Sequence, residues 1–149
     1  MQIRTLSALE CTKLLTANRV GRLGCAKDGQ PYVVPIYYTY ADNRLYAFSM
    51  LGKKIDWMRI NPLVSVQVDR HGSAQGWKSV VVSGRYEEYP DRIGHKAQLE
   101  HAWSLLSKHA DWWEPGALKP IASSDAEHLP HVFFSIFIVE VSGREASES

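Results

Sequence analysis

Hydrophobic and polar residues alternate along much of the chain, as they do in strands that bury one face. The clearest case is residues 63–69, where three valines share one face and Ser65 and Gln67 lie on the other. Short turns such as Asp28-Gly29 join neighbouring runs and leave no room for parallel crossovers. The pattern therefore predicts six antiparallel strands, at residues 20–26, 31–40, 45–49, 63–69, 77–87 and 132–142.

Three helices interrupt the strands. The first begins with a capping box, Ser7 followed three residues later by Glu10, and extends to about Ala17. The second covers residues 53–61, because the residue before Pro62 avoids helical geometry. The third covers residues 90–109 at roughly helical spacing. Antiparallel strands with helices at their edges indicate an α+β fold, and six such strands close most readily as a barrel, in one domain over residues 1–149.

Several segments depart from this regular pattern. Pro35 falls inside the second predicted strand, which must be an edge or irregular there because proline donates no ladder hydrogen bond. Residues 70–76 and 111–130 are expected to be loops, and residues 145–149 a frayed tail. Two of the five tryptophans, Trp112 and Trp113, lie in the longer loop. They either cover a ligand or an interface, or form a small core of their own.

Composition narrows the functional classes. The net charge is +1 and 45% of the residues are hydrophobic, which excludes a disordered chain and gives no reason to expect nucleic acid as a partner. The most apolar stretch, residues 132–141, is about half a bilayer span. Cys11 and Cys25 have no metal-site or disulfide-framework spacing. We expect a cytoplasmic protein that does not enter a membrane.

The segment Ser49-Met50-Leu51-Gly52-Lys53-Lys54 links the end of a predicted strand to the start of a helix. A helix start presents free backbone N–H groups and a partial positive charge, so lysines there are electrostatically misplaced. A phosphate would correct this, held by the N–H groups, the Ser49 hydroxyl and two ammonium groups. The alternative is that Lys53 and Lys54 simply point into water.

The strand around Pro35 is a second candidate. Proline frees a backbone position from ladder pairing, so groups near it can face a planar heterocycle. An ordinary buried strand explains the same residues equally well.

Together these segments resemble the pyridoxamine 5′-phosphate oxidase-like family, and more narrowly its flavin-nucleotide-binding and nitroimidazole-resistance-like branch. No single segment is specific, but their order along the chain is. The matching segments are Gly21–Gly24, Asp28–Ile36, Leu45-Tyr46, Ser49, Gly52–Asp56, Asn61–Val66, Ser79–Arg85 and Ile138–Arg144.

The resemblance implies a six-stranded split β-barrel that binds FMN, with two flavins at a homodimer interface. It assigns the flavin phosphate to Ser49, Gly52, Lys53 and Lys54, and the isoalloxazine ring to the strand of Val34, Pro35, Ile36 and Tyr37. It implies that Trp77, Lys78 and Ser79 contribute from the other side of the site.

One departure from the family pattern concerns the chemistry. Nitroimidazole-resistance relatives often carry a histidine just before the serine of the phosphate loop, where this chain has Phe48. A phenyl ring donates no proton and forms no adduct. The resemblance therefore implies an FMN-dependent oxidoreductase acting on a small molecule, with no catalytic side chain identified. Its reductant would be a nicotinamide nucleotide or another protein.

Two other classes fit the sequence. One is a non-catalytic protein that stores or senses flavin. The other is a haem- or deazaflavin-binding split barrel. The six histidines have no metal-ligand spacing, so no metal site is predicted.

Overall fold

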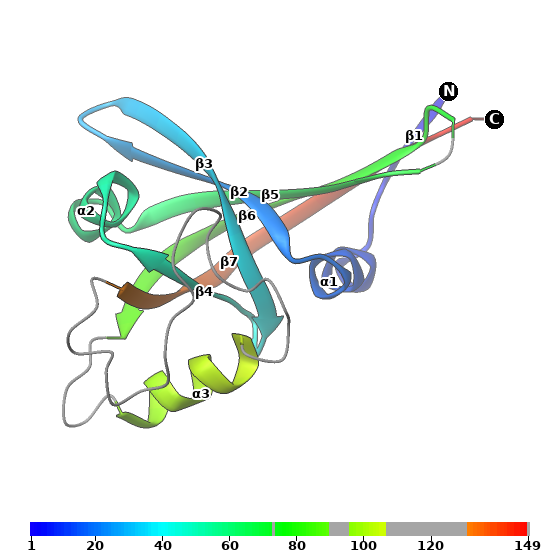
Figure 1. The fold of residues 1–149 in the computed structure, drawn as a ribbon. Coiled ribbons are helices and arrows are strands. Elements are labelled where there is room, and N and C mark those ends of the chain that lie inside the picture. Colours follow the sequence, from blue (N-terminus) through cyan, green and yellow to red (C-terminus); the bar gives the residue numbers. More distant parts are fainter. Residues whose placement is uncertain (73, 90–95, 107–130, 149) are drawn as a thin grey trace.

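The computed structural model describes residues 1–72, 74–89, 96–106 and 131–148 (Figure 1). Within these ranges the chain forms seven strands and three helices. Their order is β1 (Gln2–Thr5), α1 (Ala8–Ala17), β2 (Val20–Lys27), β3 (Gln30–Ala41), β4 (Arg44–Met50), α2 (Lys53–Ile60), β5 (Leu63–His71), β6 (Trp77–Tyr89), α3 (Lys96–Leu106) and β7 (His131–Ser147).

Six of the strands close into a ring, as the sequence predicts. The sheet order is β1-β7-β4-β3-β2-β5-β6, and β6 pairs in addition with β7, so strands β2 to β7 surround a common interior. Every pairing is antiparallel. The antiparallel barrel with flanking helices is therefore confirmed, and β1 is one strand more than predicted.

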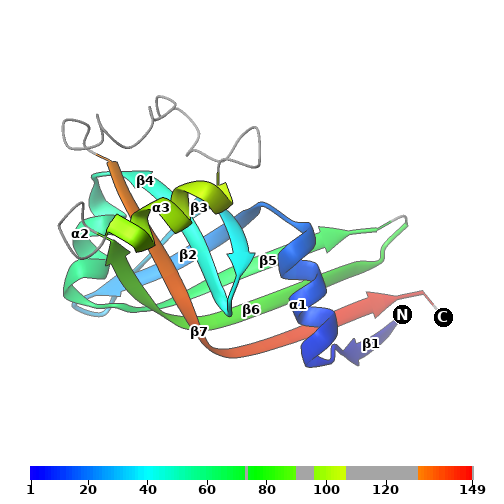
Figure 2. The ribbon, with the colours of Figure 1, turned by 90° about the horizontal axis from the view of Figure 1, so that it is seen from below.

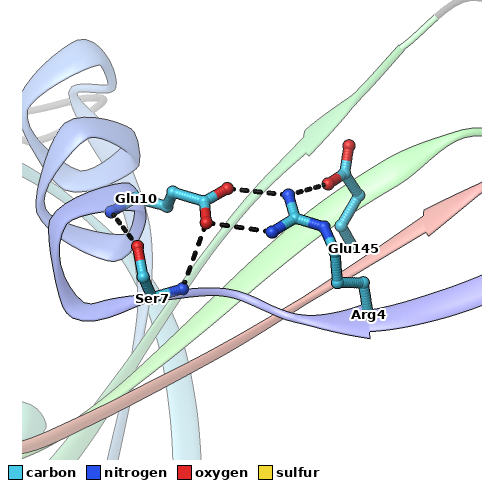
Figure 3. A network of polar contacts seen from close by, with 4 residues as sticks. All are labelled: Arg4, Ser7, Glu10 and Glu145. Carbon is cyan, nitrogen blue, oxygen red and sulfur yellow. Dashed lines mark hydrogen bonds and ion pairs between the residues drawn. The ribbon is translucent and has the colours of Figure 1, made fainter.

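The C-terminal segment is part of the sheet, and the expectation of a frayed tail was wrong. β7 pairs with β4 through its first half, with β6 along its length, and with β1 from Arg144 to Ser147. Arg4 of β1 binds Glu145 of β7 at 2.5 Å and the first-turn residue Glu10 at 2.7 Å (Figure 3). These ion pairs join two short polar segments that lack the alternation on which strand prediction depends.

The turn and helix signals are also confirmed. Ser7 and Glu10 form both hydrogen bonds of the capping box, and α1 ends at Asn18. The hairpin turns place Asp28, Gly29 and Asn43 at positive φ, as tight turns require. Arg70 and His71 were expected in a loop, but they extend β5 opposite Trp77 and Lys78.

Pro35 lies where β3 is an edge. β3 pairs with β2 from Gln30 to Tyr37, but β4 meets only its last four residues, Tyr38–Ala41. The stretch that contains Pro35 thus has one neighbouring strand, and its unpaired side needs no donor from the proline.

Helix α1 covers one end of the ring interior. Leu14 and Leu15 are buried among the core residues that line this interior. The Tyr38 hydroxyl donates a 2.7 Å hydrogen bond to the Leu15 carbonyl, fastening the helix to β3. Burial raises the pKa of Tyr38, so the phenol stays protonated and keeps donating.

The pairing of β6 with β7 is irregular at a close crossing, where Val139 of β7 is an extra, unpaired residue. The β6–β7 register shifts between Ser83 and Gly84. A Cβ atom on Gly84 would lie 2.5 Å from the Phe137 carbonyl oxygen and 2.5 Å from the Ile136 side chain. Only glycine fits at this crossing.

A smaller hydrophobic cluster lies beneath α3. It consists of Tyr46 and Phe48 on β4, Phe133 on β7 and Leu106 on α3. The Phe48 and Phe133 ring centres are 4.9 Å apart, and Phe48 is 3% exposed. Residues 96–106 of the third predicted helix are confirmed, whereas its remaining residues and the loop with Trp112 and Trp113 lie outside the described ranges.

Candidate functional site

Helix α2 begins at Lys53, the residue at which the sequence predicts it. Gly52 is its N-cap, with extended backbone geometry, and no described side chain caps the helix. Gly52 is exposed and nothing lies within 4 Å of the position that a Cβ atom would take. The first backbone N–H groups of α2 therefore face an open approach, and they carry the partial positive charge of the helix start.

The Lys53 side chain is held rather than free in solvent. Its ammonium group lies 4.6 Å from the centre of the Tyr32 ring and 4.7 Å from the centre of the Trp57 ring. The two rings are 5.6 Å apart and inclined at 55°. Cation–π attraction from both rings fixes the charge at the start of α2, close to the first residues of β3.

Lys54 and Ser49 are buried beside this point. Lys54 is 8% exposed and Ser49 is 1% exposed. The Ser49 hydroxyl donates to the carbonyl of Met50 at 2.8 Å. Both lysines also act on Cys25 of β2: burial raises the pKa of this thiol and the two ammonium charges oppose the rise. The lysines of α2 thus lie against β2 as well as at the helix start.

The predicted ring-binding strand presents its residues alternately. Ile36 is buried in the core and Val34 packs against it, so both face the interior of the ring. Pro35 is exposed and Tyr37 is half-buried on the other face. An outer ligand could contact the side chains of Pro35 and Tyr37 but only the backbone of Val34 and Ile36.

A groove of about 460 Å³ lies on the outer face of the sheet, next to Tyr32. Its floor is a row of small residues on adjacent strands, because Gly24 pairs with Ser65 and Ser65 pairs with Ser83. Its apolar walls are Val33, Leu63 and Val139, which are 64%, 62% and 68% exposed. A flat floor with apolar walls suits a planar ring system.

Sequence reasoning missed this groove. Gly24, Ser65 and Ser83 are far apart along the chain, and only the strand register places them in one row. Two signals for the groove were available in the sequence. These three small residues occupy outward positions of alternating strands, and large apolar residues occupy other outward positions.

The remaining predicted site residues lie at the far end of the molecule. Trp77, Lys78 and Ser79 begin β6 at the tip of the β5–β6 hairpin, opposite His71, Arg70 and Asp69. Both ribbon views place this tip and α2 at opposite ends (Figures 1 and 2). Within one chain, the structure therefore does not bring Trp77, Lys78 and Ser79 close to the predicted phosphate residues at the start of α2.

The described residues contain neither a metal-binding cluster nor a membrane-spanning helix. No three histidine, cysteine or acidic side chains there are grouped so that they could hold a metal ion. None of the described helices has the length and apolar character needed to cross a bilayer.

A family model and a related sequence both match nearly the whole chain. Residues 7–145 match the family model for pyridoxamine 5′-phosphate oxidase. An uncharacterised protein of Rhizobium meliloti is 49% identical over 146 residues, which cover 98% of this chain and 97% of the relative.

Three solved structures also resemble this chain over nearly its whole length. A FAD-binding protein from Mesorhizobium loti is 72% identical, with a TM-score of 0.82 over 99% of this chain and 100% of its own. A FAD-binding protein from Mycobacterium smegmatis is 20% identical, with a TM-score of 0.69 over 97% and 100% of the two chains. A protein assigned to 5-nitroimidazole resistance in Bacteroides thetaiotaomicron is 17% identical, with a TM-score of 0.75 over 97% and 89%. The last two resemblances concern the fold alone.

Proposed function

The chain belongs to the pyridoxamine 5′-phosphate oxidase family, and on this premise we propose that it binds a flavin nucleotide and serves as a flavin-dependent oxidoreductase. The flavin phosphate would lie at the start of α2, and the ring system would lie along the outer face of β2 and β3. The observation that carries this proposal is Lys53, whose charge is fixed by Tyr32 at the junction between the helix start and the groove.

The donors at the start of α2 fit a phosphate. Backbone N–H groups and the Lys53 ammonium provide hydrogen-bond donors at the helix start, and the buried Lys54 next in sequence adds positive charge. Tyr32 and Trp57 form an aromatic clamp that limits the freedom of Lys53 before a ligand arrives. This restriction reduces the conformational entropy that the lysine loses on binding. The Ser49 hydroxyl donates to the Met50 carbonyl, so it would bind a phosphate only after exchanging that hydrogen bond for one to the ligand.

The groove fits the apolar ring of a flavin. Its volume of about 460 Å³ falls within the ordinary range of small-molecule sites, roughly 300–1,000 Å³. Val33, Leu63 and Val139 would exclude water from the ring, and the backbone near Pro35 would offer hydrogen-bonding groups along the edge strand.

The cofactor would be FMN, either as such or as the FMN half of FAD. Sequence resemblance led us to expect FMN, whereas the 72% identical Mesorhizobium loti protein binds FAD. The start of α2 recognises a phosphate that both nucleotides contain, and so the contacts argued here apply to either.

The bound flavin would supply the electron-transfer chemistry. The residues of the chain would position the cofactor and exclude water, because the described lining of the groove contains no carboxylate and no imidazole. Cys25, the thiol in this lining, stays protonated because burial raises its pKa. Phe48, at the position of the histidine of some relatives, is packed beneath α3 and has no proton to donate.

We further propose that two chains form the complete site. Trp77, Lys78 and Ser79 could reach a flavin at the start of α2 only from a second copy, because they lie at the opposite end of their own chain (Figure 1). Covering the groove with a partner would also bury Val33, Leu63 and Val139, which a monomer leaves in water.

The absorption spectrum of the purified protein, followed by chromatography of the extracted cofactor, tests this proposal. We expect the two flavin bands and an FMN or FAD peak in the extract. A Soret band would instead indicate a haem protein, and a single deazaflavin band would indicate that cofactor. A flavin that no reductant reduces would favour the storage or sensing alternative.

A further inference from the structure

A second cavity lies at the end of the molecule opposite α2. Its volume is about 430 Å³, and it separates α1 from the tip of the β5–β6 hairpin. Both ribbon views show α1 near the hairpin end of the sheet (Figures 1 and 2). The cavity shares no lining residue with the groove.

Three cations from three elements surround this cavity. Lys13 comes from α1, Arg70 from β5 and Lys78 from β6. None of them forms an ion pair with another described residue. Three positive charges around one concave surface attract an anion, and arginine matches the two oxygens of a phosphate.

The acidic residues of the cavity are already engaged. Glu10 and Glu145 also line it, but both bind Arg4, at 2.7 and 2.5 Å (Figure 3). Glu10 further accepts a 3.3 Å hydrogen bond from the Ser7 backbone. His71 faces Asp69, which in turn binds Arg22 at 2.7 Å. Because Glu10 and Glu145 share the single charge of Arg4, these three residues carry one net negative charge, and the three cations of the cavity exceed it by two.

Trp77 adds an aromatic surface to the same cavity. Its indole is half-buried at the start of β6. Gly72 and Gly76 also line the cavity, and a 2.8 Å backbone hydrogen bond from Gly72 to Gly76 closes the turn there. A purine base can stack on an exposed indole face.

We propose that this cavity binds the adenosine diphosphate moiety of a dinucleotide. Arg70, Lys13 and Lys78 contact the diphosphate, and Trp77 stacks on the adenine. FAD and a reduced nicotinamide dinucleotide both contain this moiety. Naming these sources rests on the proposed flavin function, but the binding of the moiety itself does not.

Calorimetric titration of the purified protein with ADP tests the inference. We expect one ADP to bind per chain and Arg70→Ala to weaken it about tenfold or more, as loss of a charge-assisted contact does. Arg85→Ala removes an exposed arginine elsewhere on β6 and should leave ADP binding unchanged. Trp77→Leu should weaken ADP but not inorganic pyrophosphate.

Competition experiments with ADP show which dinucleotide supplies the adenosine diphosphate moiety. ADP that displaces FAD but not FMN identifies the flavin dinucleotide, whereas ADP that displaces only reduced nicotinamide dinucleotide identifies the reductant. Wild-type protein that binds no ADP, or equal losses in the Arg70 and Arg85 variants, would overturn the inference. Flavin content measured on the same samples keeps this outcome separate from failure of the proposed flavin site.

Discussion

The ammonium group of Lys53 lies 4.6 Å from the centre of the Tyr32 ring, joining the first residue of α2 to the third residue of β3. Tyr32 also lines the outer groove. Tyr32 thus belongs both to the aromatic pair that holds Lys53 and to the lining of the groove.

Lys53→Ala should weaken flavin binding by about 10- to 100-fold, the effect of losing one hydrogen bond to a charged group. Folding should be unaffected, because the Lys53 side chain is exposed. Fluorescence titration of apoprotein with FMN and FAD measures the affinity. Lys27→Ala, in the β2–β3 turn, is the control. Lys54 is left in place in this variant, because it is buried and its loss would also disturb packing. An unaltered affinity in Lys53→Ala refutes the phosphate site.

Tyr32→Leu should reduce flavin affinity severalfold by releasing Lys53, whereas Tyr32→Phe retains the ring and should behave like wild type. A cation–π contact at an exposed site contributes about 0.5–1 kcal/mol, and more when water is excluded. The diagnostic measurement is a double-mutant cycle with Lys53→Ala. Additive losses would mean that Tyr32 acts on the ligand directly and does not position the lysine.

Gly24→Val should weaken flavin binding strongly while leaving stability nearly unchanged. A Cβ atom on Gly24 meets only the Ser65 carbonyl oxygen, at an ordinary distance of 3.8 Å, and valine favours strands. The added side chain would rise from the groove floor where the ring is proposed to lie. Thermal unfolding and flavin titration on one sample separate the two effects. If the variant binds flavin as tightly as wild type, the ring lies elsewhere.

Gly84→Ala should lower the free energy of unfolding by about 2 kcal/mol or more, since overpacking against rigid backbone costs roughly 1–3 kcal/mol. The new methyl group would meet the Phe137 carbonyl oxygen at 2.5 Å, and backbone cannot move aside as a flexible side chain can. Urea denaturation gives the value. Gly24→Ala serves as the matched strand control, and equal stability of the two variants would show that the β6–β7 crossing tolerates a side chain.

The stability that Glu10 contributes should depend on pH. Its hydrogen bond to Arg4 lowers the pKa of Glu10 from 4.5 to about 2. A carboxyl whose pKa is lower in the folded state stabilises the fold above about pH 4.5, and this contribution is lost as the pH falls towards 2. Glu10→Gln keeps the capping hydrogen bond but removes the charge. Melting temperatures of both proteins from pH 2 to 7 should diverge with rising pH, and a constant difference would contradict the assignment.

Local signals predicted most of the fold because each acts over a few residues. The capping box at Ser7 and the turn at Asp28-Gly29 define where elements begin and reverse, and valine alternation defines β5. The proline argument was right for the same reason, since Pro35 lies on the unpaired side of β3. In contrast, β1 and the end of β7 exist because each pairs with a segment more than a hundred residues away.

The candidate site likewise combines features that local sequence signals predict with features that depend on contacts between distant segments. Charge at a helix start is a local property, so Lys53 and Lys54 could be identified from sequence. The groove depends on the register of β2, β5 and β6, and the aromatic clamp depends on the packing of α2 beside β3. Neither the Gly24–Ser65–Ser83 row nor the contact between Lys53 and Tyr32 has a counterpart in sequence spacing.

The pairings of β7 have a consequence for biosynthesis. This strand contacts β1, β4 and β6, so the ring lacks one wall, and β1 lacks its partner, until residues 131–147 have been translated. The nascent chain must therefore carry the exposed edges of β4 and β6, with their hydrophobic inner faces, for most of its synthesis. Such edges invite pairing with other chains. We expect ribosome-bound intermediates of this protein to need chaperone protection until the last strand emerges.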